Sequence, residues 1–280
     1  MRNEATIAAR GHVIVAGLTA AVLLLSLDQA RAASLETIPT RPGVTESFIL
    51  IPPQGLTPAE QGHPKASVIL LVGGDGNMRL TPAKIDNPSG NFLARTRMNF
   101  AAHGLEVALV DAPSDHRDLG DWRASADHAT DLAALIAYLH RKVGVPVWLV
   151  GTSRGTVSAA NAAARLAQAP ADERPDGIVL TSSITIATPR EGATVFTTER
   201  DAVRVPVLVV AHKDDKCFVT PPSNAAKLAA AFPNAPKTEF MIFEGGDRPR
   251  SDPCQPFAAH GYLGIEAKVV DAIAGWILTH

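Results

Sequence analysis

The sequence predicts an α/β protein in which strands of an open parallel sheet alternate with helices. Two observations favour this class. Short apolar runs rich in β-branched residues alternate along the chain with longer runs of helical periodicity. At 145–165 an apolar run, a glycine-rich turn and an alanine-rich segment follow one another directly, which is typical of a buried strand that turns sharply into a helix.

Length and composition indicate one ordinary globular domain. The chain has 280 residues, of which 46% are hydrophobic and 19% charged, and its formal net charge is −2. This balance excludes the strongly basic or acidic proteins that bind nucleic acid or anionic membrane surfaces. A chain of this size can bury a full core without a structural metal. We therefore expect residues 33–280 to form a single domain.

The first 32 residues have the pattern of a signal peptide. Arg2 and Arg10 precede an apolar run at 13–27, and Ala30-Arg31-Ala32 supplies the small-x-small pattern of a cleavage site. We predict cleavage after Ala32 and a periplasmic or secreted protein with no stable membrane insertion. The alternative is a retained anchor, although about 15 apolar residues are short for a span that needs about 20.

A glycine-rich loop follows the second predicted strand. The strands are expected at 46–51 and 67–72, and the second runs into Gly73-Gly74-Asp75-Gly76-Asn77. Such a turn lets backbone N–H groups approach a ligand, and by position Asp75 is the candidate oxyanion donor. A plain tight turn is the alternative. A nucleotide phosphate loop is disfavoured because the lysine-serine/threonine ending is missing.

The next elements are a helix at 91–103, a strand at 106–110 and a second helix. That helix is expected to begin after Ser125 as N-cap and to end near Gly144. Between the strand and the second helix lies the polar loop 111–117. Because ligands of parallel sheets bind beyond the carboxyl ends of strands, Asp115, His116 and Arg117 either line a substrate site or belong to a solvated loop.

The turn at 151–155 carries the pattern G-x-S-x-G. A serine on a sharp strand-to-helix turn adopts a strained conformation, and small residues two positions away let the strand and the helix approach. Ser153 would then project from the sheet edge, above the N-terminus of the following helix. The pattern alone also occurs by chance. Its interpretation as a nucleophile therefore depends on an acid and a histidine in the correct order downstream.

Both partners follow in that order. A strand predicted at 205–210 leads into Asp214 and Asp215, and we favour Asp215 over Asp214 because the loop must turn before it presents its acid. His260 stands in a loop before the closing helix. The other histidine downstream of that acid, His280, is the last residue, where fraying is expected. The candidate triad is therefore Ser153, Asp215 and His260.

These residues together resemble the α/β-hydrolase superfamily, in particular its small lidless serine esterase and dienelactone-hydrolase-like branch. The resemblance extends from the loop at 72–76 through the serine turn to 260–262. It implies a mostly parallel twisted sheet with helices on both faces, no separate lid domain, and an oxyanion hole made by the backbone N–H groups of Asp75 and Arg154. Two features depart from the family: Gly73-Gly74 stands where His-Gly is common, and Ser153 stands where true dienelactone hydrolases carry cysteine.

The predicted function is hydrolysis of small carboxylic esters through an acyl-enzyme. In this reaction His260 takes the proton of Ser153 and later activates water, so no cofactor or metal is expected. An amidase or peptidase with the same triad is the nearest alternative. A non-catalytic binding protein of the same fold is the alternative from another class. The alcohol and acyl groups and the oligomeric state are left open.

The chain has two cysteines, Cys217 and Cys254. Cys217 stands two residues after the proposed acid and Cys254 six before the proposed base. If the triad forms, these loops meet at one sheet edge, and export would allow the thiols to oxidise. We predict a disulfide that ties the acid loop to the histidine loop; the alternative is two separate buried thiols.

Overall fold

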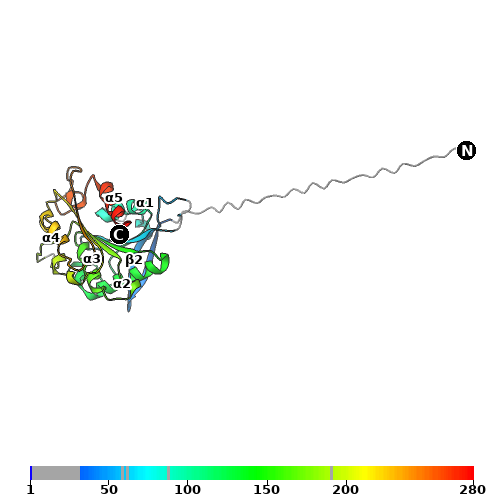
Figure 1. Cartoon of the computed structure of the whole chain (residues 1–280), viewed down its shortest axis with the longest axis horizontal. Coiled ribbons are helices and arrows are strands. Elements are labelled where there is room, and N and C mark those ends of the chain that lie inside the picture. The colour runs from blue at the N-terminus through cyan, green and yellow to red at the C-terminus, as the bar shows by residue number, and fades with distance from the viewer. Residues whose placement is uncertain (2–31, 58–59, 61–62, 87–88, 190–191) are drawn as a thin grey trace. The chain divides into compact units, whose positions relative to one another are not determined.

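The structure is a computed structural model that describes residues 1, 32–57, 60, 63–86, 89–189 and 192–280. Residues 2–31, which include most of the predicted signal peptide, lie outside the described residues, so the leader stays a prediction. Residues Ala32–His280 form one compact unit, drawn in colour in Figure 1. None of the described helices is long and apolar enough to cross a membrane.

The described residues form an eight-stranded sheet with the order β1-β2-β4-β3-β5-β6-β7-β8. β1 pairs antiparallel with β2, and β2 antiparallel with β4, whereas the other pairs are parallel. The predicted fold class, a mostly parallel sheet, is confirmed. The strands are β1 (Ser34–Arg41), β2 (Val44–Ile51), β3 (Ala66–Leu71), β4 (Leu105–Val110), β5 (Val147–Thr152), β6 (Gly177–Thr181), β7 (Val207–His212) and β8 (Thr238–Phe243).

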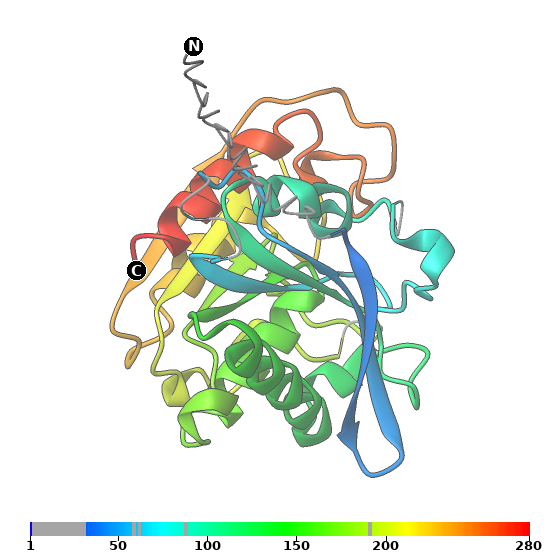
Figure 2. The same cartoon turned by 90° about the vertical axis from the view of Figure 1, so that its right-hand side faces the viewer.

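Helices cover both faces of this sheet, as Figures 1 and 2 show. One apolar core lies between the sheet and α1 and α5, and a second between the sheet and α2, α3 and α4. The inner strands are buried along their whole length because both of their faces are covered. The helices are α1 (Phe92–Ala102), α2 (Ala126–Val143), α3 (Gly155–Arg165), α4 (Ala225–Ala229) and α5 (Glu266–Ile277).

The ends of α2 show how local sequence sets an element. The Ser125 side chain accepts a hydrogen bond from the N–H of His128, and Gly144 closes the helix in the left-handed conformation with φ 68°. Ser at the N-cap satisfies a donor that has no partner within the helix, and Gly tolerates positive φ without a Cβ clash. Both predicted ends of this helix are therefore confirmed.

Two strands differ from the sequence prediction. β1 was not expected, because its polar sequence includes Pro39 and it lies at the edge of the sheet, where only one side is paired. β7 begins at Val207 rather than at 205, because Pro206 lacks an N–H; its carbonyl accepts a bond from the N–H of Ile178 just before the β6–β7 ladder.

Candidate active site

Ser153 lies on a sharp turn between the end of β5 and the start of α3. Its φ is 53°, in the left-handed region that non-glycine residues rarely adopt, and its N–H donates to the carbonyl of Thr181 at 3.0 Å. Such strain persists only where the surrounding structure holds it, and it clusters at functional sites. The turn therefore presents a half-buried hydroxyl at the carboxyl edge of the sheet.

The two glycines of G-x-S-x-G are required by packing. A Cβ on Gly155 would overlap the carbonyl oxygen of Leu71 in β3, and one on Gly151 would overlap the carbonyl oxygen of Gly155. Neither overlap involves a flexible side chain, so neither could be relieved by rotation. The two glycines of the pattern therefore allow β5, β3 and α3 to pack closely beneath Ser153.

Asp215 and His260 form a buried pair. The Nδ1 atom of His260 lies 3.0 Å from Oδ2 of Asp215, and the two residues are 5% and 7% exposed. The other carboxylate oxygen, Oδ1, accepts the N–H of Cys217 at 2.9 Å. A carboxylate held in this way can fix the ring orientation of a histidine and stabilise its cation.

The structure places Asp214 elsewhere. Its side chain is exposed, and its backbone N–H donates to Nδ1 of His212. The other ring nitrogen of His212, Nε2, lies 2.9 Å from the carbonyl oxygen of Gly245. Of the two adjacent acids, it is Asp215 that contacts His260. The turn of the loop after β7 separates them, with Asp215 inward and Asp214 toward solvent.

A pocket of about 260 Å³ brings the candidate nucleophile and base together. Its wall combines the glycine loop after β3, the serine turn and the segment around His260. Four of the lining residues are glycines, so much of the wall is backbone. The lining residues are Gly73, Gly74, Asp75, Ser89, Gly90, Asn91, Phe92, Thr152, Ser153, Cys254, Gln255, Pro256, His260 and Gly261.

The two predicted oxyanion donors flank Ser153 in different ways. Asp75 lines the pocket, in a turn that the N–H of Gly76 closes by donating to the Gly73 carbonyl at 3.3 Å. Arg154 is the N-cap residue of α3, so its peptide lies at the positive end of that helix. Backbone N–H groups at such positions can stabilise the oxyanion of a tetrahedral intermediate.

Three polar residues of the site were not singled out from the sequence. Thr220 Oγ1 donates to Oδ2 of Asp215 at 2.9 Å and lies 3.2 Å from Nδ1 of His260. Ser182 donates to the His260 carbonyl at 2.8 Å and contacts the hydroxyl of Tyr262, which donates in turn to the Val210 carbonyl. Burial raises the pKa of the Tyr262 phenol, so it remains a neutral donor.

The loop at 111–117 does not line the pocket. Asp115 pairs with Arg41 at 3.0 Å, and His116 both contacts Asp115 and stacks on Trp122 with ring centroids 3.9 Å apart. These contacts join the loop to β1 and to Trp122 of the short 3-10 helix Gly120–Ala124. Asp115 and Arg117 are exposed, so the segment fits the alternative of a solvated loop better than substrate binding.

The disulfide between Cys217 and Cys254 is present, with Cα atoms 4.5 Å apart. The prediction of this pair is confirmed. Cys254 lines the pocket, and the N–H of Cys217 donates to Asp215. The disulfide therefore links the loop that holds the acid directly to the pocket wall next to His260.

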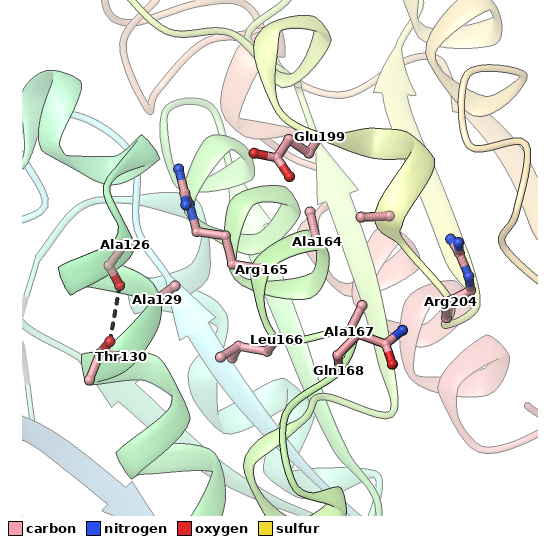
Figure 3. Close-up of a pocket in the computed structure, with 11 residues that line it drawn as sticks. Ala126, Ala129, Thr130, Ala164, Arg165, Leu166, Ala167, Gln168, Glu199 and Arg204 are labelled. Carbon is pink, nitrogen blue, oxygen red and sulfur yellow. Dashed lines mark hydrogen bonds between the residues drawn. The ribbon is translucent and has the colours of Figure 1, made fainter.

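A larger pocket of about 500 Å³ lies at the opposite end of α3 (Figure 3). Its wall includes Arg165, Glu199 and Arg204, and the rest is mostly alanine and short polar side chains. None of the candidate catalytic residues lines it. The larger volume of this pocket therefore does not single it out, since Ser153 and His260 line the smaller one.

Comparison with known proteins gives matches at the level of structure. No protein-family model matches the sequence, and no curated protein is significantly similar to it. Est1E from Butyrivibrio proteoclasticus matches with a TM-score of 0.56 and 13% identity, over 88% of this chain and 98% of that one.

Two other solved structures are similarly close. A dienelactone hydrolase from Anabaena variabilis has a TM-score of 0.56 and 14% identity, over 89% of this chain and 99% of that one. Thermogutta terrifontis esterase 2, in a form phosphoramylated by tabun, has a TM-score of 0.56 and 16% identity, over 89% and 96%. The chain therefore has the α/β-hydrolase fold. Identities this low establish the fold but not the activity.

Proposed function

We propose that the protein is a serine hydrolase that cleaves small carboxylic esters through an acyl-enzyme. The observation that carries this proposal is the joint placement of Ser153, on a strained turn, and the buried His260–Asp215 pair around one pocket. The names of the matched structures, two of them esterases and one a dienelactone hydrolase, agree with it.

In the proposed reaction His260 takes the proton of Ser153 as its hydroxyl oxygen attacks the ester carbonyl. Asp215 holds the imidazole and stabilises its cation. The N–H groups of Asp75 and Arg154 stabilise the oxyanion. His260 then passes the proton to the leaving alcohol, and finally removes a proton from the water that releases the acid and restores Ser153.

The pocket also favours a substrate class. It is small compared with typical ligand pockets of about 300–1,000 Å³, and its side chains include Ser89, Asn91 and Gln255, which offer neutral hydrogen-bonding groups. We therefore propose esters with a short acyl group and a polar alcohol in preference to long-chain esters.

The experiment is hydrolysis of p-nitrophenyl esters of graded acyl length beside a matched panel of anilides and peptide amides. Short esters should be cleaved fastest, and Ser153→Ala should lower kcat by roughly 10⁴-fold or more without changing the melting temperature appreciably. Faster cleavage of amides would favour the peptidase alternative. Binding without turnover, together with no reaction of Ser153 with a fluorophosphonate, would favour the non-catalytic alternative.

We also propose that the protein is exported to the periplasm or secreted, with cleavage after Ala32. The leader pattern at 1–32 and the disulfide both support an oxidising destination. N-terminal sequencing of the protein recovered from a cell fractionation tests this. A mature chain that begins at Ala33 is the expected result, and an intact Met1 in a membrane fraction would indicate a retained anchor.

A further inference from the structure

Arg123 lies buried directly behind the glycine loop of the pocket. It belongs to the short 3-10 helix Gly120–Ala124 and is 2% exposed. Its guanidinium donates through Nη2 to the carbonyls of Val72 at 3.1 Å and Gly74 at 3.4 Å. The two carbonyls flank Gly73, so one cation contacts the loop on both sides of that residue.

A second set of contacts braces the same loop. The N–H of Leu119 donates to the carbonyl of Asp75 at 2.8 Å, and the N–H of Arg123 donates to the carbonyl of Leu119 at 3.0 Å. A Cβ on Gly76 would lie 2.7 Å from Nη2 of Arg123, so the loop packs directly on the guanidinium. Hydrogen bonds and direct packing therefore join the 3-10 helix to the loop.

The contact with Gly74 determines the direction of a neighbouring N–H. In a planar trans peptide the carbonyl of Gly74 and the N–H of Asp75 point in opposite directions. Because the Gly74 carbonyl is turned inward to Arg123, the Asp75 N–H is turned away from it. Asp75 lines the pocket that contains Ser153 and Arg123 does not, which favours an orientation of this N–H toward the pocket.

The guanidinium also reaches the helix that carries the other predicted oxyanion donor. Its Nη1 donates to Oγ of Ser158 at 2.9 Å, and Ser158 lies in the first turn and a half of α3, whose N-cap is Arg154. One buried cation thus connects the Asp75 loop with the start of α3. Hydrogen bonds from a charged donor are stronger than neutral ones and polarise the peptides they contact.

We infer that Arg123 is a positioning residue for oxyanion stabilisation: it orients the Gly74–Asp75 peptide toward the oxyanion and holds this loop in register with α3. This inference rests on the proposed function, because it assigns a role within the same site. It goes beyond the triad because Arg123 does not itself line the pocket.

The test compares Arg123→Lys, Arg123→Gln and Arg123→Met with wild type on the best short ester. Removal of one oxyanion donor costs roughly 10²- to 10³-fold in kcat. The Gln and Met variants should therefore lose roughly 10²-fold in kcat, with KM changed less than roughly 3-fold. Affinity for a trifluoromethyl ketone, which forms a tetrahedral oxyanion on Ser153, should fall in parallel. Arg123→Lys keeps the charge, so its kcat and its affinity for the ketone should lie between those of the Gln and Met variants and those of wild type.

Arg200→Met is a matched control. Arg200 also donates to two backbone carbonyls, those of Ala231 and Phe196, and neither residue lines the pocket. This variant should lose stability while its kcat stays near that of wild type. If folded Arg123 variants kept wild-type kcat and ketone affinity, or lost no more of either than Arg200→Met, Arg123 would be only structural.

A measurement on the wild-type protein makes the test independent of how the variants fold. In ¹⁵N-labelled protein the amide proton of Asp75 should move downfield when the trifluoromethyl ketone binds Ser153, because it then donates to an oxyanion. An unchanged Asp75 amide in the adduct would overturn the inference. Failure of wild type to cleave any ester or to react with a fluorophosphonate would instead overturn the proposed function, and the inference with it.

Discussion

Gly73 lies directly against the side chain of Ser153: a Cβ atom on Gly73 would stand 2.9 Å from Cβ and 3.5 Å from Oγ of Ser153. The same added atom would lie 3.1 Å from the carbonyl oxygen of Thr152. Real Cβ atoms essentially never show a contact as short as that with Cβ of Ser153, and the contact with the Thr152 carbonyl oxygen is also tight. Glycine at this position therefore leaves room for the side chain of Ser153.

The first prediction is that Gly73→Ala lowers kcat/KM by roughly 10²-fold, because a displacement of the nucleophile by less than 1 Å is costly. Steady-state kinetics on a short p-nitrophenyl ester measures this. The control is Gly275→Ala, since a Cβ there meets nothing within 4 Å on the exposed side of α5. That variant should keep full activity and gain up to about 1 kcal/mol of stability. Equal activity of the two variants would refute the steric argument.

The second prediction separates two adjacent acids. Asp215→Asn should reduce kcat by roughly 10⁴-fold, because an amide in contact with Nδ1 of His260 favours the wrong tautomer. Asp214→Asn should change kcat by less than roughly 2-fold, since its carboxylate is exposed and away from the ring. Kinetics of both variants at one pH decides the assignment. A greater loss in Asp214→Asn would transfer the acid role to that residue.

The third prediction concerns the disulfide. The bond closes a loop with a sequence separation of 37 residues, so it should contribute roughly 3 to 4 kcal/mol in the chain-entropy model. Cys217→Ala/Cys254→Ala should therefore show a lower melting temperature than oxidised wild type. Because Cys254 lines the pocket beside His260, activity should decline at a lower temperature than global unfolding. Coincident loss of activity and of the circular dichroism signal would show that the bond supports only the global fold.

The fourth prediction is a pH dependence of stability that arises from His128. Burial, with the nearby positive charge of Arg123, lowers the pKa of His128 to about 3, and neither ring nitrogen has a hydrogen-bond partner among the described residues. The unfolded chain, with a pKa near 6.5, binds the proton more readily. The free energy of unfolding is therefore highest, as far as His128 affects it, above about pH 6.5, and it falls as the pH is lowered toward 3. The loss between pH 7 and pH 5 should be roughly 2 kcal/mol.

Urea titrations at pH 7 and pH 5 of wild type and His128→Phe measure this contribution. The phenylalanine keeps an aromatic ring beside Trp122, whose ring centroid lies 4.9 Å from that of His128, but it does not titrate. Burial raises the pKa of Glu46, so protonation of this residue stabilises the folded state as the pH falls and opposes the effect of His128. Glu46 is present in both proteins, so the difference between them isolates the effect of His128. An identical pH dependence in both proteins would exclude His128 as the source.

Local sequence patterns account for most of the helix and strand positions. The alternation of apolar runs and amphipathic segments depends on short-range periodicity, so β4, α2 and the turn at Ser153 could be predicted in place. The edge strand β1 could not, because its polar residues are paired on one side only and carry no apolar period. The disulfide was predictable once two loops were assigned to one sheet edge.

The sequence alone shows the order of Ser153, Asp215 and His260 along the chain. It also shows the glycines that the serine turn requires, because that turn depends on residues close together in the chain. The contact of Asp215 with His260, the bond from Thr220 to that carboxylate and the burial of Arg123 behind the Gly74 carbonyl are properties of the tertiary structure. Each depends on the direction in which a loop turns after its strand and on contacts between segments distant in sequence. Such contacts form only when the sheet order brings those segments together.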